Sequence, residues 1–384
     1  MRARTPISWV SVPVGVGLGL GLLVVLAHWQ RDFVADELGL GLQTYSFRAV
    51  DASGEPISGD ASDAPALAGR LRSQRRAGRT TALWLGASQL HAVNRPGPEP
   101  RLAVAVAEQR ARERGGDVAY TQLSLPNAGP LELLAVYQAF REPPTRPDRL
   151  VLALTYDDLS EIALRDSVVA LLDAARPDLA GASGTGSGPE AILARARAQA
   201  ARERSEPPAA PVERSAIAGT PQERLEQSLV ATLEVLWPAY AERHSLRSAG
   251  VAAWKLPLTS LVFRLRGRPI QRIDPRARAV SEQALRALIA QTRSDGVALL
   301  VYEAPHRPDA ERFYHDRDAY DAFHAEIAAA ASREGFAHLD LERLVPAETY
   351  GLTDQFLPDV FHFREEGHRL LGSAIDRWFE ERGH

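Results

Sequence analysis

Short, continuously apolar runs alternate along this chain with segments of helical periodicity, and this alternation limits the possible folds more than any other feature. The runs cover residues 81–86, 118–123, 150–154, 297–302 and 336–340. Because they lack polar–apolar alternation, they predict strands that are buried on both faces. Between the runs, spacings such as Tyr320, Phe323 and Ile327 mark one face of a helix. Strands and helices in alternation predict an α/β fold in which helices cover both sides of a mainly parallel sheet.

The N-terminus carries a second constraint. Residues 7–29 include a long apolar run with Trp9 and Trp29 near its ends. About 20 apolar residues are enough to cross a hydrocarbon layer of roughly 30 Å, and tryptophan prefers the two interfaces of that layer. A cleaved signal peptide is the competing interpretation, because Arg2 and Arg4 could form its basic region. The run is longer than a usual signal core and no A-x-A site follows it, so we expect an uncleaved transmembrane helix.

The charges that flank this segment predict its orientation. Arg2 and Arg4 precede it, whereas residues 31–37 contain one arginine and three acidic residues. Since positive charge stays on the cytoplasmic side, the N-terminus is expected inside. The remainder of the chain is then an exported domain held by a single span.

Composition suggests how the exported part is organised. The stretch 51–65 is rich in Gly, Ser, Asp and Pro and is typical of a loop, and 181–188 has the composition of a flexible linker. Residues 191–204 are strong helix formers. We therefore divide the chain into a cytoplasmic tip and anchor (1–30), a membrane-proximal linker region (31–78), the first part of the globular domain (79–174), a helical, partly flexible insertion (175–280) and the second part of the domain (281–384).

Charge and cysteine content exclude several functional classes. The chain has 45 basic and 49 acidic residues, a net charge of −4, and no cysteine. A dedicated nucleic-acid binder would carry a basic face, so no nucleic-acid partner is expected. Disulfides, thiol nucleophiles and thiolate zinc sites are ruled out. The histidines and aspartates within 306–316 match no ligand spacing, and we expect neither a metal nor a cofactor.

Three residues with catalytic side chains stand near the expected carboxyl edge of the sheet, where parallel sheets bind their ligands. Ser88 follows the first strand in the turn Gly86-Ala87-Ser88-Gln89, although such a serine can also be an ordinary helix N-cap. Asp359 precedes His362 by three residues in the expected loop after the last strand. An aspartate so placed can hold an imidazole in one tautomer, and the imidazole can then accept a serine proton.

These blocks resemble those of the SGNH (GDSL-like) hydrolases. The turn 86–89 is similar to the Gly-Asp-Ser-Leu block of that family. Asp359 and His362, followed by Gly367 and His368, resemble its Asp-x-x-His block and the helix behind it. The second match is the more specific of the two.

The resemblance covers roughly residues 80–170 and 295–380. It implies a flavodoxin-like three-layer SGNH-type domain that contains a parallel sheet and needs no cofactor. In such a domain Ser88 would be the nucleophile, His362 the general base and Asp359 its orienting partner.

The middle blocks of the family are matched less well. The candidates for binding substrate or donating to an oxyanion are Gly86, Asn127, Gly129 and Asp157. Where the family has Gly-x-Asn-Asp, this chain has Leu154-Thr155-Tyr156-Asp157-Asp158. The carboxylate of Asp157 would repel a developing oxyanion unless it is protonated or turned away.

Two of these positions also have a simpler structural interpretation. Asp157 and Asp158 could cap a helix that begins near Leu159. His368 is expected to be a helix-surface residue and not a second histidine of the site.

Together with the anchor, the layout resembles the membrane-anchored family members that act beside membrane-bound O-acyltransferases, such as the D-alanine transfer protein DltD and the alginate O-acetylation proteins. It implies a serine esterase or O-acyltransferase on the bacterial cytoplasmic membrane, with its main domain periplasmic or extracellular. The implied partners are an acylated small molecule or envelope polysaccharide and a membrane-bound O-acyltransferase. The alternative, favoured by the altered asparagine block, is a catalytically weak scaffold with the same fold that binds a membrane-bound O-acyltransferase.

Overall fold

The computed structural model describes residues 44–97, 100–181, 186–205, 273–308, 316–352 and 358–382. The predicted anchor over residues 7–29 lies outside these ranges. Within them, no helix is long and apolar enough to cross a membrane.

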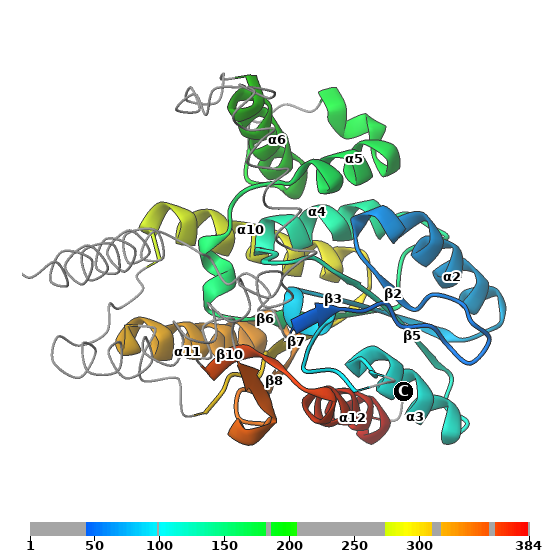
Figure 1. Ribbon diagram of the computed structural model, residues 1–384. Helices are drawn as coiled ribbons and strands as arrows, with labels where there is room; N and C mark the ends of the chain where they lie inside the picture. The colour runs from blue at the N-terminus through cyan, green and yellow to red at the C-terminus, as the bar shows by residue number, and fades with distance from the viewer. Residues whose placement is uncertain are drawn as a thin grey trace, which may run out of the picture. The chain divides into compact units, whose positions relative to one another are not determined.

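The centre of the structure is a six-stranded sheet in which every neighbouring pair of strands is parallel (Figure 1). All five predicted strands are present, and a two-residue strand is added at one edge. In spatial order the strands are β2 (Ser58–Gly59), β5 (Val118–Ser124), β3 (Thr80–Gly86), β6 (Arg149–Leu154), β7 (Ala298–Glu303) and β8 (Ala337–Asp340).

Both faces of the central strands are buried, as the continuous apolar runs predict. The edge strand β8 is only partly buried, so the burial predicted for residues 336–340 is wrong. Successive side chains of a strand point to opposite faces. On β3, Leu83 and Leu85 belong to one cluster of buried residues and Trp84 belongs to the other. On β7, Val301 and Tyr302 divide in the same way.

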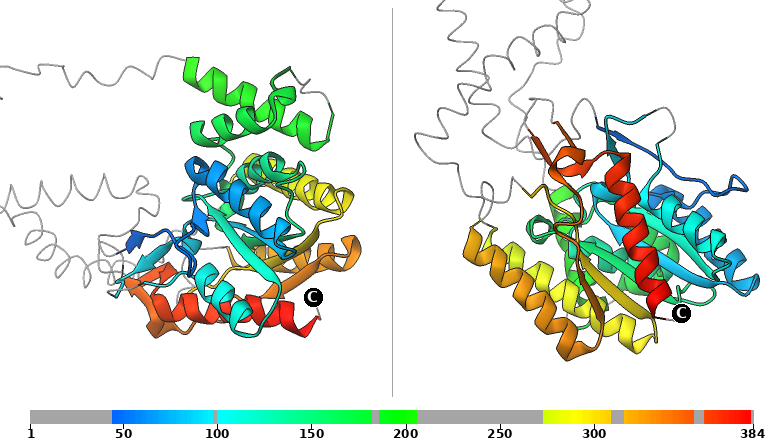
Figure 2. Two further views of the ribbon diagram at one scale, coloured as in Figure 1. Left: turned by 90° about the vertical axis from the view of Figure 1, so that its right-hand side faces the viewer. Right: turned by 90° about the horizontal axis from the view of Figure 1, so that it is seen from below.

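Helices supply the outer layers, which confirms the predicted α/β class with helices on both sides of the sheet (Figures 1 and 2). Two helices cover the Trp84 face, α3 (Ala103–Glu113) and α12 (Glu365–Glu381). The helices that contribute to the Leu83 face are α2 (Ala64–Arg76), α4 (Pro130–Phe140), α5 (Asp166–Ala175), α6 (Pro189–Ser205), α10 (Pro275–Ser294) and α11 (Arg317–Glu334).

Short elements lie outside the main sheet. Two antiparallel pairs are formed by β1 (Thr44–Ser46) with β4 (Ala92–Asn94) and by β9 (Tyr350–Leu352) with β10 (Pro358–Phe363). The 3-10 turns are η1 (Ala61–Asp63), η2 (Ser88–Leu90), η3 (Asp157–Ser160), η4 (Pro177–Gly181) and η6 (Ala347–Thr349).

The described part of the predicted linker region 31–78 belongs to the domain itself. Strand β2 extends the sheet, and α2 packs on it through Leu67 and Leu71, which are both buried. The apolar face of α2 is narrow and stands among arginines, so its burial depends on the neighbouring sheet and not on a strong local pattern. The domain therefore begins well before the predicted boundary at residue 79.

The second predicted boundary, at residue 280, also differs from the structure. Helix α10 begins at Pro275, where the Asp274 side chain accepts a hydrogen bond from the Arg276 N–H at 2.8 Å, and its first turn already buries Ala277. At the other end of the predicted insertion, α6 confirms the helix expected over 191–204, but its Ile192 joins the core. Residues 206–272 lie outside the described ranges.

The path of the chain through the sheet creates a crevice. From β3 the chain crosses to β5 on one side, and from β5 it returns past β3 to β6 on the other side. Ligands of such sheets bind at the carboxyl ends of the strands where this reversal occurs. Here the reversal lies between β3 and β6, and Ser88 follows directly on β3.

Gly86 ends β3 at a tight packing position. An added Cβ would lie 2.7 Å from the Cβ of Ala153 and 2.9 Å from the Cδ1 of Leu90, two buried side chains. Because the strand would have to shift, Gly86→Ala is expected to lower the free energy of unfolding by about 1–3 kcal/mol in urea denaturation. The control Gly69→Ala adds a Cβ on α2 whose nearest neighbour is the end of the Arg72 side chain at 3.8 Å, an ordinary contact, and should raise stability by about 0.5–1 kcal/mol. Equal effects of the two substitutions would contradict this packing argument.

Candidate active site

Ser88 begins the 3-10 turn η2 directly after β3. Ala87 keeps an extended backbone, and the N–H groups of Leu90 and His91 bond to the carbonyls of Ala87 and Ser88 at 3.2 and 3.1 Å. This turn buries Gln89 and Leu90 while the side chain of Ser88 stays partly exposed. The serine is therefore held at the edge of the sheet and remains accessible.

Ser88, His362 and Asp359 form one hydrogen-bonded chain, as the sequence predicts. The Ser88 Oγ lies 2.9 Å from the His362 Nε2, and the His362 Nδ1 lies 3.1 Å from the Asp359 Oδ2. With the Nδ1–H donating to the carboxylate, the Nε2 is free to accept the serine proton. This is the geometry of a serine nucleophile with its general base.

Asp359 is a buried carboxylate that is held ionised. Its Oδ1 accepts hydrogen bonds from the N–H groups of Phe361 at 3.0 Å and His362 at 2.9 Å. Burial would raise the pKa of Asp359, but the hydrogen bonds from His362 and Phe361 outweigh burial and lower that pKa below its usual value. The carboxylate therefore keeps its charge beside the imidazole.

Strand β10 carries Asp359 and His362 on one side only because it is irregular. Residues three apart on a regular strand point to opposite faces. The pairing of β10 with β9 shifts between Pro358 and Phe363, and the Asp359 side chain bonds back to the N–H of His362. The expected loop is thus a short, bent strand.

Asn94 is a site residue that the sequence analysis missed. It is fully buried on β4, and its Nδ2 donates to the Asp359 Oδ2 at 3.2 Å and to the Thr44 Oγ1 at 2.8 Å. Gly351 on β9 makes room for it, because a Cβ there would overlap the Asn94 side chain. These partners are far apart in the sequence, so no local spacing could have indicated the role of Asn94.

Gln89 has a comparable role next to the serine. Its Nε2 donates to the carbonyl of Pro305 at 2.6 Å and to that of Phe361 at 2.9 Å. The amide thereby joins the Ser88 turn to the segment after β7 and to the strand that carries His362.

The remaining predicted residues lie on the turn and on the two loops beside it. Gly86 contributes packing, and its carbonyl accepts the N–H of Leu125 at 3.1 Å. Asn127 has φ +49°, a left-handed conformation that asparagine tolerates. Gly129 packs against the backbone of Glu161, where a Cβ would overlap the carbonyl. The loops after β5 and β6 therefore meet beside β3.

The structure corrects the predicted capping role of Asp157 and Asp158. No α-helix begins near Leu159, because residues 157–160 form the 3-10 turn η3 and α5 begins at Asp166. Asp158 closes that turn instead, since its Oδ2 accepts the N–H of Thr155 at 2.7 Å. Burial, together with the charge of nearby Glu161, raises the pKa of Asp157 to about 7.

His368 was expected on a helix surface, and that prediction is wrong. Its exposed fraction is 0%. Its Nδ1 accepts the N–H of Ala103 at 3.3 Å, and its Nε2 donates to the carbonyl of Ala92 at 3.2 Å. The residue lies on the face of α12 that packs on α3 with Leu371, so it links three segments inside the domain.

The described ranges contain no group of three or more histidine, aspartate or glutamate side chains arranged to hold a metal ion. Of the residues considered in the sequence, Asp309 and His315 lie outside those ranges. His306 is buried, and its ring lies 4.8 Å from that of Phe361.

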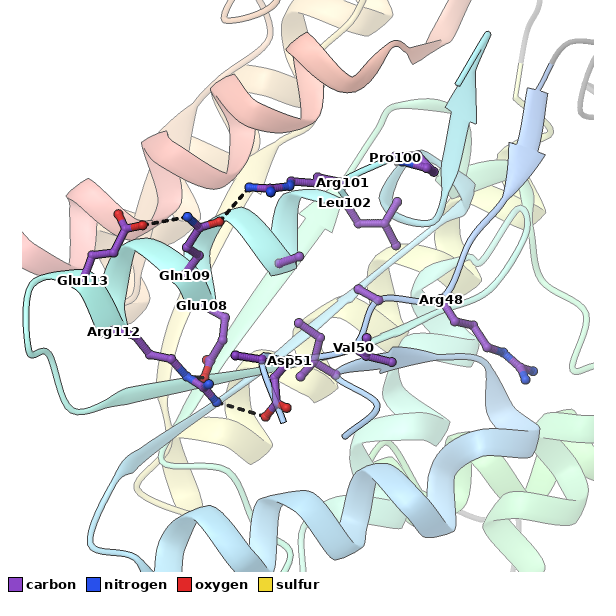
Figure 3. Close-up of a pocket in the computed structure, with 14 residues that line it drawn as sticks. Arg48, Val50, Asp51, Pro100, Arg101, Leu102, Glu108, Gln109, Arg112 and Glu113 are labelled. Carbon is purple, nitrogen blue, oxygen red and sulfur yellow. Dashed lines mark hydrogen bonds and ion pairs between the residues drawn. The ribbon is translucent and has the colours of Figure 1, made fainter. Parts of the chain in front are cut away.

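A cavity of about 630 Å³ lies between residues 48–52 and α3 (Figure 3). Polar side chains of its lining bond with one another: Arg112 donates to the Asp51 Oδ2 at 2.9 Å, and Arg101 donates to the Gln109 Oε1 at 2.9 Å. None of Ser88, Asp359 and His362 lines it. The triad at the sheet edge is therefore the stronger candidate for chemistry.

Comparison with protein-family models and with curated proteins finds no match to this chain.

The burial of His368 has a consequence for the pH dependence of stability. Burial lowers the pKa of His368 to about 4, whereas an unfolded histidine titrates at about 6.5. Between these pH values the unfolded chain binds a proton that the folded chain does not, so acidification costs about 3 kcal/mol of stability. We expect the variant His368→Gln to lack this contribution, because its amide does not titrate and can bond to both backbone groups. The free energy of unfolding, measured in urea between pH 7 and pH 4, should then depend less steeply on pH. An unchanged slope would contradict the assignment.

Proposed function

We propose that this chain is a membrane-anchored, exported serine esterase or O-acyltransferase with a flavodoxin-like SGNH-type domain. The observation that carries the proposal is the 2.9 Å contact between the Ser88 Oγ and the His362 Nε2, with Asp359 behind the imidazole. These groups lie at the carboxyl edge of a parallel sheet, where its strand order reverses.

The same geometry suggests the reaction sequence. His362 takes the Ser88 proton while the Oγ attacks the carbonyl carbon of an acyl ester, and His362 then protonates the departing alcohol. The acyl group is left on the Ser88 Oγ. In the second half, His362 takes a proton from water or a sugar hydroxyl, whose oxygen attacks the acyl carbon and releases Ser88. Asp359 stays ionised and stabilises the imidazolium in both halves.

The finer features of the proposal are supported by the strand order and by the sequence. Without the short edge strand β2, the order β5-β3-β6-β7-β8 is 2-1-3-4-5 in chain order, which is the flavodoxin-like arrangement. The blocks at 86–89 and 359–368 resemble SGNH hydrolases, and the apolar run at 7–29 supports an anchor in a bacterial cytoplasmic membrane. We take an envelope polysaccharide or an acylated small molecule as substrate, and a membrane-bound O-acyltransferase as partner.

A fluorophosphonate probe tests the nucleophile, because it reacts only with an activated serine. The full-length protein should be labelled, Ser88→Ala should not be, and His362→Ala should be labelled more than about a thousandfold more slowly. Ser332→Ala, which removes a serine hydroxyl on the exposed side of α11, serves as the matched control. Labelling of Ser88→Ala at the wild-type rate would overturn the mechanism.

One observation favours the second candidate function, a catalytically weak scaffold. Asp157 follows β6, the neighbour of β3, at the position where the family resemblance calls for an asparagine donor. Since its pKa is about 7, Asp157 is largely ionised above that pH and would then oppose an oxyanion. Below that pH the neutral acid could donate a hydrogen bond in the manner of an amide.

The variant Asp157→Asn distinguishes the active enzyme from the catalytically weak scaffold. We expect the ratio of variant to wild-type labelling rates to rise by roughly tenfold or more as pH increases from 6 to 9, because only the wild type acquires the opposing charge. Taking the ratio cancels the pH effects that both proteins share. A ratio that stays flat would remove Asp157 from the oxyanion site, and absence of labelling in both folded proteins would favour the scaffold.

A further inference from the structure

The carboxylate of Asp359 has a full set of hydrogen-bond donors. An ionised carboxylate offers about four acceptor positions, two on each oxygen. The backbone N–H groups of Phe361 and His362 occupy those of Oδ1 at 3.0 and 2.9 Å. The Asn94 Nδ2 at 3.2 Å and the His362 Nδ1 at 3.1 Å occupy those of Oδ2. The imidazole therefore takes the one position that the other donors leave.

Asn94 decides which position on Oδ2 that is. The two backbone donors fix Oδ1 only, and by themselves they would let the His362 ring approach Oδ2 from either of its lone-pair directions. With Asn94 in one direction, a single direction of approach remains for the ring. In that direction the His362 Nε2 lies 2.9 Å from the Ser88 Oγ.

The orientation of the Asn94 amide is itself fixed. Because an ionised carboxylate only accepts hydrogen bonds, the amide must turn its nitrogen and not its oxygen toward Asp359. The same nitrogen donates to the Thr44 Oγ1 at 2.8 Å. Thr44 and Asn94 are direct partners in the pairing of β1 with β4, which places their side chains next to each other. Both residues are buried, so water does not compete for these contacts.

The fold also reserves space for this amide. Gly351 on β9 lies against Asn94, and a Cβ there would overlap the Asn94 side chain. Residues from β1, β4 and β9 therefore meet at one amide, and that amide contacts the carboxylate of the triad directly.

We propose that Asn94 is a positioning residue of the triad and that Thr44 holds it in place, so that strand β1 controls the orientation of Asp359 and His362. The inference rests on the roles of Asp359 and His362 in the proposed function, and it adds a fourth residue and the strand that holds it. Strand β1 has three residues and forms a two-stranded sheet with β4, outside the central sheet. Displacement of β1 would thus disturb the triad while the central sheet stays intact.

The rate of fluorophosphonate labelling in the full-length protein tests this role. Asn94→Leu keeps the size of the side chain and removes its donors, and Thr44→Val removes the acceptor that holds the amide. The maximal rate of Ser88 labelling should fall roughly ten- to a hundredfold in Asn94→Leu and about three- to tenfold in Thr44→Val. The probe concentration that gives half the maximal rate should not change, because neither buried residue reaches the probe.

Gln138→Leu is the matched control, since it removes a buried amide on α4 that accepts a hydrogen bond from Arg176 at 3.0 Å. Its maximal labelling rate should equal that of the wild type. A wild-type rate in Asn94→Leu would overturn the proposal. Thermal unfolding shows whether each variant is folded at the temperature of the measurement, and Thr44→Val, the milder change, provides the test if Asn94→Leu does not fold.

Proton NMR of the full-length protein in detergent separates this inference from the proposed function. A proton held in a charge-assisted hydrogen bond, such as that on the His362 Nδ1, resonates far downfield, and His362→Ala identifies the signal by its loss. The chemical shift should move in Asn94→Leu, by less in Thr44→Val, and not in Gln138→Leu. Such a movement supports the positioning role even if Ser88 is never labelled. A signal that does not move in Asn94→Leu, with Ser88 labelled in the wild type, would leave the serine mechanism standing and reject the role of Asn94.

Discussion

Burial of the sheet on both faces determines where this protein can place polar chemistry. A polar atom inside such a strand must find a partner in the protein, as the Trp84 Nε1 does in the Tyr302 hydroxyl at 3.1 Å. Side chains that must reach a ligand have to leave the strands at their ends. The reversal of strand order between β3 and β6 selects one stretch of the carboxyl edge, and Ser88 lies there.

The candidate site is held together by buried amides. Gln89 connects the serine turn to the backbone of the histidine strand, and Asn94 donates to the carboxylate that orients the histidine. The side-chain nitrogen of each amide donates to two acceptors, and an alternative arrangement would leave these groups unpaired, so the contacts rigidify their surroundings. These contacts hold the triad as rigidly as the core, although the Ser88 side chain is accessible.

The sequence was sufficient to predict features that depend on residues close together along the chain. The five main strands and helix α11 follow from apolar runs and helical spacing, and they lie where these predict. Short motifs indicated Ser88, Asp359 and His362, and the structure brings these side chains into hydrogen-bond contact. Features that depend on distant partners could not be predicted. Asn94 and Asp359 are 265 positions apart, as are Ala103 and His368. The boundary at residue 79 was misplaced for the same reason, because the sequence of α2 shows only a narrow apolar face and the burial of that face depends on distant strands of the sheet.

Strand β1 and the residue after it contact groups near the candidate site. Thr44 accepts a hydrogen bond from Asn94, and Ser46 and Phe47 line a pocket whose wall includes His91, directly after the Ser88 turn. These are the first described residues of the chain, yet they contact groups near the triad. A soluble fragment that starts at the predicted domain boundary of residue 79 would thus lack one wall of the pocket and the partner of a buried amide. Expression of an intact domain requires a start site upstream of Thr44.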